Sequence, residues 1–287
     1  MTQNTNARRF TILLQAATPI AHGDTTTGVD NATNTRLFMR QGMLVGGIPA
    51  RVPAISENAL RSVLLREPLA DHLVQTLGIE RGTLPQSVMN LIYAGGNMAA
   101  GSKAPAQEVA YGHAVKRLYP SIDLLGGSVD AFILPRSRLR ISAWLVAREY
   151  ADAIAHVAPE LLEAASQCSA FDMLTEETRT RGTGSNSSGN QMIYTYETLA
   201  AGSQILVEIT LDAHTPPAAV AAVGHALAVW DGYIGGQNRQ GRGRCIIKED
   251  SLPDAAPYLA HLQEHGEAMR DGLVNGTLGV EARLCAA

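Results

Sequence analysis

Lysine is almost absent from this chain, whose only lysines are Lys103, Lys116 and Lys248, whereas the same 287 residues contain 20 arginines. The guanidinium group suits bidentate contacts with phosphate, although genome base composition produces the same bias and the net charge of -4 argues mildly against nucleic acid. Long apolar runs are also missing, and the polar segment 1–9 has no apolar signal region. We therefore expect no membrane span and no secretory signal.

Cysteine is scarce as well. Cys168, Cys245 and Cys285 are odd in number and show no metal-ligand spacing, which predicts free thiols in the cytoplasm. The five-residue pattern H-x-x-E-H at 261–265 lacks a third ligand, so we predict no metal and no cofactor. A hydrophobic content of 46% with 17% charged residues is typical of a soluble globular core.

A glycine and arginine loop near the C-terminus is the most informative motif. Its glycines allow positive φ and close backbone approach, and its arginines suit phosphate oxygens. No Gly-Lys-Ser/Thr ending follows, which favours a polymer phosphate backbone over a nucleotide. The alternative is a flexible solvated turn. The residues concerned are Gly235, Gly236, Arg239, Gly241, Arg242, Gly243 and Arg244.

Two further segments are candidate phosphate sites. Arg136, Arg138 and Arg140 alternate, so a strand would place them on one face, roughly 6.8 Å apart, near the phosphate spacing of an extended single strand. A solvated arginine face explains this pattern equally well. The second segment is the helix start Ser56–Arg61, where the free N–H groups around Ser56 and Asn58, together with Arg61, form a candidate anion site. The carboxylate of Glu57 weakens this site. The alternative is that Ser56 is only an ordinary helix cap.

Two polar stretches complete the candidates. The stretch 176–190 is too polar to bury a core and predicts a mobile hairpin tip, whose Arg179 and Arg181 are candidates for ligand contact. The polar loop 22–35 contains His22 and Asp30, which are candidate groups for RNA cleavage, although ordinary loop polarity explains them as well.

The pattern of elements indicates an α+β protein with mainly antiparallel strands. A first strand is expected at 9–17, and a strand pair at 129–134 and 138–147. A second hairpin is expected from 192–199 and 204–212, and a last strand at 244–248. Helices are expected at 57–66, from Pro68 to about 77, and at 85–94, 108–118, 160–167, 217–230 and 253–270.

In this order, the segments resemble the RAMP superfamily of CRISPR proteins, and especially the backbone subunit of class 1 effector complexes. The resemblance rests on Ile55–Ser62 (ISENALRS), Leu124–Gly127 (LLGG) before a strand, Tyr196–Ser203 (YETLAAGS) and the glycine loop. Glu57 and Ser62 stand where glycines are usual. The resemblance implies a ferredoxin-like, RNA-recognition-type core with helical insertions and a protruding β-hairpin thumb. One domain would span 1–287, with insertions at 18–54 and 78–130 and the thumb at 172–195.

The resemblance also implies a function. Such a subunit binds guide RNA along its phosphates and polymerises with copies of itself. It presents the guide to a target nucleic acid alongside other effector subunits. Type IV or type I-D complexes are the nearest in motif shape, and a non-enzyme is expected, although Asp30 occupies the loop where cleaving relatives carry a catalytic aspartate. The alternatives are a metal-independent endoribonuclease with His22 as proton carrier, which would process precursor guide RNA, and a small-molecule enzyme with a glycine phosphate cradle.

Overall fold

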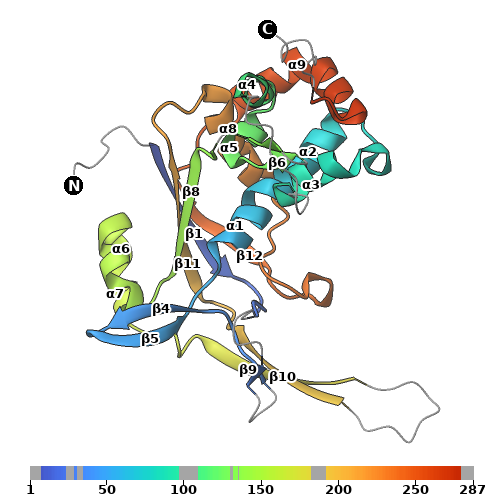
Figure 1. The fold of residues 1–287 in the computed structure, drawn as a ribbon. Coiled ribbons are helices and arrows are strands. Elements are labelled where there is room, and N and C mark those ends of the chain that lie inside the picture. The colour runs from blue at the N-terminus through green and yellow to red at the C-terminus, as the bar shows by residue number, and fades with distance from the viewer. Residues whose placement is uncertain are drawn as a thin grey trace, which may run out of the picture.

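The computed structural model describes residues 8–23, 29–30, 35–96, 109–129, 132–134, 136–181 and 192–278. A four-stranded antiparallel sheet lies at its centre (Figure 1). In order across the sheet, its strands are β12 (Cys245–Asp250), β1 (Arg8–Ala16), β11 (Gln204–Leu211) and β8 (Leu139–Leu145). Helices separate β1 from β8 and β11 from β12, which gives the βαββαβ order of a ferredoxin-like core. The predicted α+β class is confirmed.

The first core helix follows the predicted sequence signals. Ser56 caps α1 (Glu57–Leu60), and the helix continues through a π-helical stretch, η1 (Arg61–Arg66), into α2 (Glu67–Thr76). Pro68 lies just after the π-helical stretch, and because it has no N–H it donates no hydrogen bond to the preceding turn. Leu60, Leu64 and Leu65 are fully buried. This helix therefore presents one apolar face to the core and leaves Ser62 and Arg61 partly accessible.

The second core helix, α8 (Pro217–Val229), is buried along most of its length because it consists largely of Ala, Val and Gly. It contacts η1, α2, α5 (Pro120–Leu125) and α9 (Ala256–Asn275). These helices gather at one end of the molecule (Figure 1). The other helices are α3 (Gln86–Ala94), α4 (Val109–Leu118), α6 (Ala151–Val157) and α7 (Leu162–Ser166). The 3-10 turns are η2 (Arg81–Thr83), η3 (Arg148–Tyr150), η4 (Pro159–Leu161) and η5 (Asn238–Gln240).

A long hairpin projects from the opposite end (Figure 1). Its strands, β9 (Leu174–Arg181) and β10 (Met192–Leu199), form a second sheet with β3 (Thr35–Arg36) and β2 (Val29–Asp30). The predicted protruding hairpin is confirmed, but ordered pairing extends through 176–181, which the composition had assigned to a mobile tip. Residues 182–191 lie outside the described residues. A shorter hairpin, β4 (Arg40–Val45) and β5 (Ile48–Pro53), lies at the same end.

Two predicted strand pairings are wrong. The expected pair 129–134 and 138–147 does not form, because β6 (Ser128–Val129) pairs with β7 (Phe132–Ile133) whereas β8 pairs with β11. The expected hairpin of β10 and β11 also does not form. In its connecting turn, the N–H of Ala200 donates to the carbonyl of Met173 and that of Gly202 to the carbonyl of Ala16. The turn is thus bonded to β1 of the central sheet and to the residue before β9, and the chain passes from one sheet to the other here.

The predicted insertions contain whole elements, β2 to β5 within 18–54 and α3 to α5 within 78–130. Their standing as insertions into one domain stays a prediction. In the part of the chain that the structure describes, no helix combines the length and the apolarity that a membrane crossing requires.

Candidate nucleic-acid interface

A pocket of about 430 Å³ lies between the first core helix, the glycine loop that follows α8 and the base of the long hairpin. Five separate segments contribute to its wall, and sequence reasoning had singled out four of them one by one. The lining residues are Ala21, His22, Gly23, Arg36, Leu37, Ala59, Ser62, Val63, Tyr196, Glu197, Gly235, Gly236 and Gln237. We call this the central pocket. The start of the first helix and the glycine loop are therefore parts of one surface.

The glycines of the loop have two different roles. Gly235 and Gly243 have φ of +81° and +79°, and a Cβ on them would lie 2.4 Å from the carbonyl O of Ala21 and 2.1 Å from that of Ile234. Close packing of the protein's own backbone therefore requires these two glycines. Gly236 is exposed, and Gly241 has open space around it. These latter two are the positions where absent side chains leave room for a ligand.

The arginines of the loop also differ. Arg242 is buried, and both of its Nη atoms donate to the carboxylate of Glu177 on β9, Nη1 at 2.8 Å from Oε1 and Nη2 to Oε2. Its guanidinium lies 5.0 Å from the centroid of the Tyr196 ring. Arg239 and Arg244 are exposed. Arg242 thus already has a carboxylate partner, and Arg239 and Arg244 are the loop arginines open to a phosphate.

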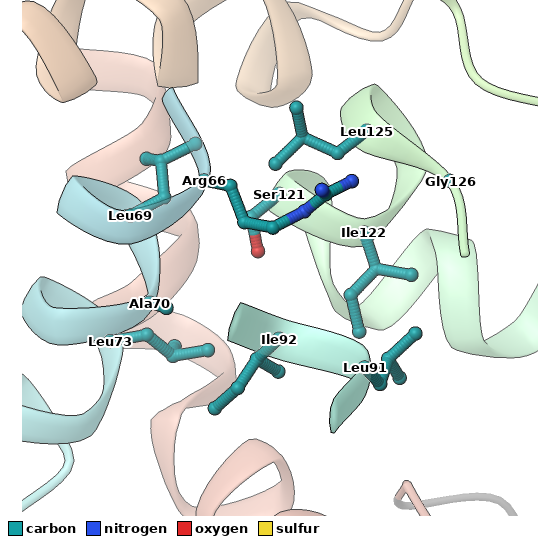
Figure 2. Close-up of a pocket in the computed structure, with 10 residues that line it drawn as sticks. All are labelled: Arg66, Leu69, Ala70, Leu73, Leu91, Ile92, Ser121, Ile122, Leu125 and Gly126. Atoms are coloured by element: carbon teal, nitrogen blue, oxygen red, sulfur yellow. The ribbon is translucent and has the colours of Figure 1, made fainter. Parts of the chain in front are cut away.

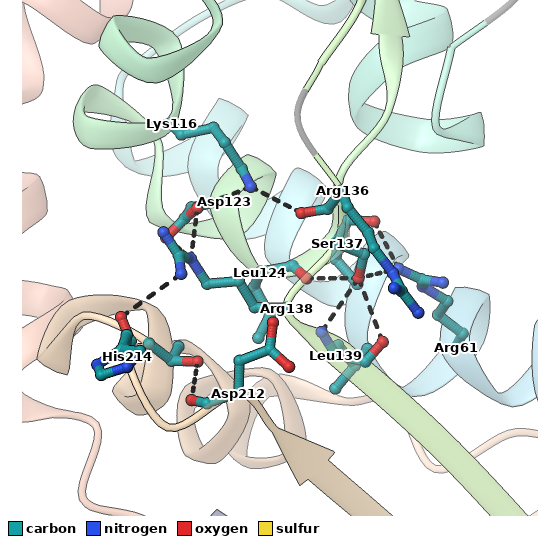
Figure 3. A network of polar contacts seen from close by, with 12 residues as sticks. Arg61, Lys116, Asp123, Leu124, Arg136, Ser137, Arg138, Leu139, Asp212 and His214 are labelled. Atoms are coloured by element: carbon teal, nitrogen blue, oxygen red, sulfur yellow. Dashed lines mark hydrogen bonds and ion pairs between the residues drawn. The ribbon is translucent and has the colours of Figure 1, made fainter. Parts of the chain in front are cut away.

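At the first helix, the cap is as predicted and the arginine points elsewhere. The Oγ of Ser56 accepts from the N–H of Ala59 at 3.4 Å, and Asn58 is exposed. Arg61 donates from Nη2 to the carbonyl of Leu125 and to the Oγ of Ser137, both at 2.5 Å (Figure 3). Arg61 therefore caps the carboxyl end of α5, and burial lowers its pKa.

His22 lines the central pocket as a neutral ring. Its Nε2 accepts the backbone N–H of Ser56 at 3.1 Å, which leaves the proton on Nδ1. Burial lowers the pKa of His22, so the neutral form is favoured further. This geometry gives no support to the proton-carrier role considered from the sequence. Asp30 belongs to β2, whose backbone pairs with Thr35, and its side chain lies outside the described part of the molecule.

The predicted row of three arginines on one strand face is wrong, because β8 begins only at Leu139. Arg136 is exposed and Arg140 is 68% exposed. Arg138 donates from Nε to both carboxylate oxygens of Asp123 at 2.8 Å, and Asp123 also binds Lys116 Nζ at 3.0 Å (Figure 3). Arg138 thus has a structural partner, whereas Arg136 and Arg140 remain accessible.

Arg179 and Arg181 occupy the outer part of β9, opposite Tyr194 and Met192, and their side chains are outside the described residues. Sequence reasoning missed Arg36, an exposed residue of β3 at the central pocket. It also missed Glu197, which accepts from Arg40 Nη2 at 2.8 Å and from the N–H of Phe38 at 2.7 Å. The Tyr196-Glu197 pair belongs to a motif that had been noticed, but no spacing signal links Glu197 to Arg40.

A second cavity is too small to be a binding site. Figure 2 shows Arg66 reaching from η1 toward α5 among Leu69, Leu91 and Ile122. Its volume is about 10 Å³, which is room for about one water molecule. Burial, followed by the neighbouring charge of Arg61, lowers the pKa of Arg66. Among the residues that the structure describes, no three His, Cys, Asp or Glu side chains are grouped to hold a metal ion.

Comparison with known proteins identifies the fold. No protein-family model and no curated protein matches the sequence. A chain of a Type IV-B CRISPR complex has the same fold, with a TM-score of 0.57 and 17% identity over 89% of this chain and 98% of that chain. A chain in the cryo-EM structure of the Type III-B Cmr-beta complex bound to cognate target RNA matches with a TM-score of 0.43 and 9% identity, over 88% of this chain and 62% of that chain. The fold is therefore that of a chain from a Type IV-B CRISPR complex.

Proposed function

We propose that this protein is an RNA-binding subunit of the RAMP superfamily. More specifically, we propose a guide-RNA-binding backbone subunit of a class 1 CRISPR effector complex of a type IV-like kind, which polymerises with copies of itself and works beside other effector subunits. The observation that carries this proposal is the fold match, which extends over 98% of the Type IV-B chain and 89% of this one. A match of that extent reaches well beyond the four-stranded core sheet and its two helices.

The central pocket suits a nucleic-acid backbone. Arg36 offers an exposed guanidinium, Gly236 leaves the wall without a side chain, and Gln237 supplies an exposed amide. Glu197 also lines the pocket, but Arg40 at 2.8 Å offsets its charge, so the carboxylate does not repel a phosphate as a free one would. Arg239 and Arg244 of the same loop are also exposed. Specificity would come from pairing between the guide and its target, so these groups need to hold only the backbone.

RNA binding of this kind has a clear signature in solution. The equilibrium constant for single-stranded RNA should fall linearly with salt on a logarithmic plot, with a slope near 0.7 per phosphate contact, for any sequence. Fluorescence anisotropy with two unrelated RNAs of several lengths measures this slope. Electron microscopy of protein co-expressed with guide RNA should show a helical ladder. Binding that depends strongly on sequence and hardly on salt would overturn the proposal.

One pair of variants tests the pocket directly. Arg36→Ala should weaken binding to all RNAs alike and reduce the salt slope by about 0.7, because one phosphate contact is lost. Arg270→Ala is the matched control, since Arg270 is 53% exposed, belongs to α9 at the helical end of the molecule (Figure 1) and does not line the pocket. Equal effects of the two variants would mean that binding depends on net charge alone and not on the central pocket.

We further propose that the subunit holds RNA without cutting it. Assembled complex should leave complementary labelled RNA intact in the presence of divalent metal. Regularly spaced products that disappear in Asp30→Ala would make it a target-cleaving subunit. Metal-independent cutting of precursor RNA that requires His22 would favour the endoribonuclease alternative instead.

A further inference from the structure

The long hairpin is held at its foot by two arginine–carboxylate pairs that have no counterpart among the predicted sites. Glu177 on β9 binds Arg242 of the glycine loop, and Glu197 on β10 binds Arg40 of β4. All four side chains are largely buried, with exposed fractions of 29% and 7% in the first pair and 13% and 16% in the second. We call them the loop pair and the β4 pair.

The two pairs grip opposite faces of the hairpin. Glu177 lies directly opposite Tyr196 in the ladder, so their side chains share one face, the face on which Arg242 approaches the Tyr196 ring. Glu197 is the next residue after Tyr196, and successive side chains of a strand point to opposite faces. The two ion pairs therefore lie on opposite faces of the hairpin, at the same position along its length. A contact on one face alone would leave the hairpin free to tilt away from it.

Each pair is reinforced by a neighbour that fixes its geometry. Thr198 donates from Oγ1 to Oε1 of Glu177 at 3.3 Å, and Thr198 is fully buried. Glu197 uses its second oxygen to accept the N–H of Phe38 at 2.7 Å, while Arg40 Nη1 donates to the carbonyl of Phe38 at 3.2 Å. Buried ion pairs add little net stability, because desolvation offsets their attraction, but they favour one arrangement over others. Position is therefore the property that such pairs are suited to set.

The central pocket lies across the same joint. Tyr196 and Glu197 of the hairpin form one part of its wall, and Gly235, Gly236 and Gln237 of the glycine loop form another. A change in the hairpin's angle would move one wall against the other. We propose that Glu177 with Arg242, and Glu197 with Arg40, are positioning residues that set the angle of the hairpin over RNA held in the central pocket. This inference rests on the proposed function, because it assigns these residues a role in placing the RNA.

The test compares two neighbouring glutamates of β9. Glu177→Gln removes the charge that holds Arg242, whereas Glu176→Gln changes an exposed residue on the other face of the same strand. Hydrogen exchange of the free protein is measured first. Amides of 234–244 and 192–199 should exchange at least about tenfold faster in Glu177→Gln than in the wild type, and Glu176→Gln should match the wild type, since tenfold corresponds to about 1.4 kcal/mol of local opening.

The second measurement is nuclease footprinting of RNA-bound assemblies. The wild type and Glu176→Gln should give evenly spaced exposed nucleotides, whereas Glu177→Gln should give an irregular or altered spacing. The RNA affinity of Glu177→Gln should fall by less than about tenfold. A merely structural role would lower affinity and thermal stability together and leave the spacing unchanged. Restoration of the regular spacing by Glu177→Asp would support positioning through the carboxylate.

The outcomes separate the two proposals. If the wild type binds RNA without any regular footprint, the proposed filament function fails whatever the variants do. If the wild type gives a regular footprint and Glu177→Gln keeps both that footprint and normal hydrogen exchange, the positioning role is wrong and the function stands. The same design applies to Glu197→Gln, which should increase exchange at 35–40.

Discussion

The glycine loop and the segment 136–140 each carry three arginines, and the structure uses the two triplets in the same way. In each, the central arginine is bound to a carboxylate, Arg242 to Glu177 and Arg138 to Asp123, and its neighbours remain exposed. An arginine-rich pattern therefore overstates the number of guanidinium groups that a phosphate can reach. Whether an arginine can bind a phosphate depends on whether it already binds a carboxylate that is shielded from water, and not on the spacing of the arginines.

The two regions differ in what the bound arginine connects. Asp123 is 2% exposed and holds both Arg138 and Lys116, so it joins α4 and α5 to the start of β8 within the helical end. Glu177 is 29% exposed and joins the glycine loop to the hairpin. The first contact lies inside a packed body, whereas the second spans a joint between two parts. We expect the Asp123 contact to matter more for the free energy of unfolding and the Glu177 contact more for the angle of the hairpin.

The largest effect expected is that of Asp123→Asn. Loss of its charge leaves Lys116, which is 6% exposed, and Arg138, which is 27% exposed, without a carboxylate, which should reduce the free energy of unfolding by about 3–5 kcal/mol. Glu177→Gln should cost less, because water reaches its more exposed carboxylate. Urea unfolding of both variants measures the difference, and Asp212→Asn is the control, with an expected change under about 1 kcal/mol. Equal losses for Asp123→Asn and Glu177→Gln would contradict the distinction between body and joint.

Alanine at two glycines with the same φ separates strain from close packing inside the glycine loop. Gly241→Ala should cost about 1–2 kcal/mol of stability from left-handed strain alone, because its Cβ meets open space. Gly243→Ala should cost about 1–3 kcal/mol more, since its Cβ would lie 2.1 Å from the carbonyl of Ile234. Thermal unfolding of the two variants gives the comparison. Similar melting temperatures would show that the loop relaxes and that Ile234 does not constrain it.

The exposed arginines of the two regions should differ in RNA binding. Arg239→Ala with Arg244→Ala should reduce the salt slope by about 0.7 for each contact, because both residues belong to the glycine loop, whose Gly235, Gly236 and Gln237 line the central pocket. Arg136→Ala with Arg140→Ala should reduce it less, since neither residue belongs to a segment that lines that pocket. Anisotropy titrations over a range of salt concentrations give both slopes. A larger change in slope for Arg136→Ala with Arg140→Ala would contradict this prediction and indicate that the RNA lies nearer the helical end.

The sequence was sufficient for the core and for most helices. Ser56 as a cap, the apolar positions Leu60 and Leu64, and the small-residue helix Pro217–Val229 are local signals, and the structure agrees with each. Strand partners were less predictable, because pairing is set by tertiary contacts. The turn 200–203 looks like a hairpin turn by composition, but its N–H groups bond to Ala16 of β1 and to Met173, the residue before β9.

The candidate site was predictable in its parts and not in its chemistry. The helix start and the glycine loop were recognised, and they do meet in one pocket. Arg36 was missed because a single arginine in a polar loop carries no periodic signal. The roles of Arg242, Arg138 and Arg61 were missed because their partners, Glu177, Asp123 and the end of α5, are distant along the chain.

The smallest effect concerns Arg140, whose availability to RNA depends on how strongly Asp212 holds it. The two charged groups are 3.8 Å apart, and their side chains are 68% and 49% exposed, so water screens their attraction. A double-mutant cycle with Arg140→Ala and Asp212→Ala should give a coupling of at most about 0.5 kcal/mol that falls as salt rises, because exposed pairs are screened over about 10 Å at 0.1 M. The same cycle on Arg138 and Asp123 should give a coupling of several kcal/mol with little salt dependence, since Asp123 is buried. A strong, salt-independent coupling at Arg140 would place it with Arg138 as a structural residue and leave Arg136 as the one accessible arginine of the three.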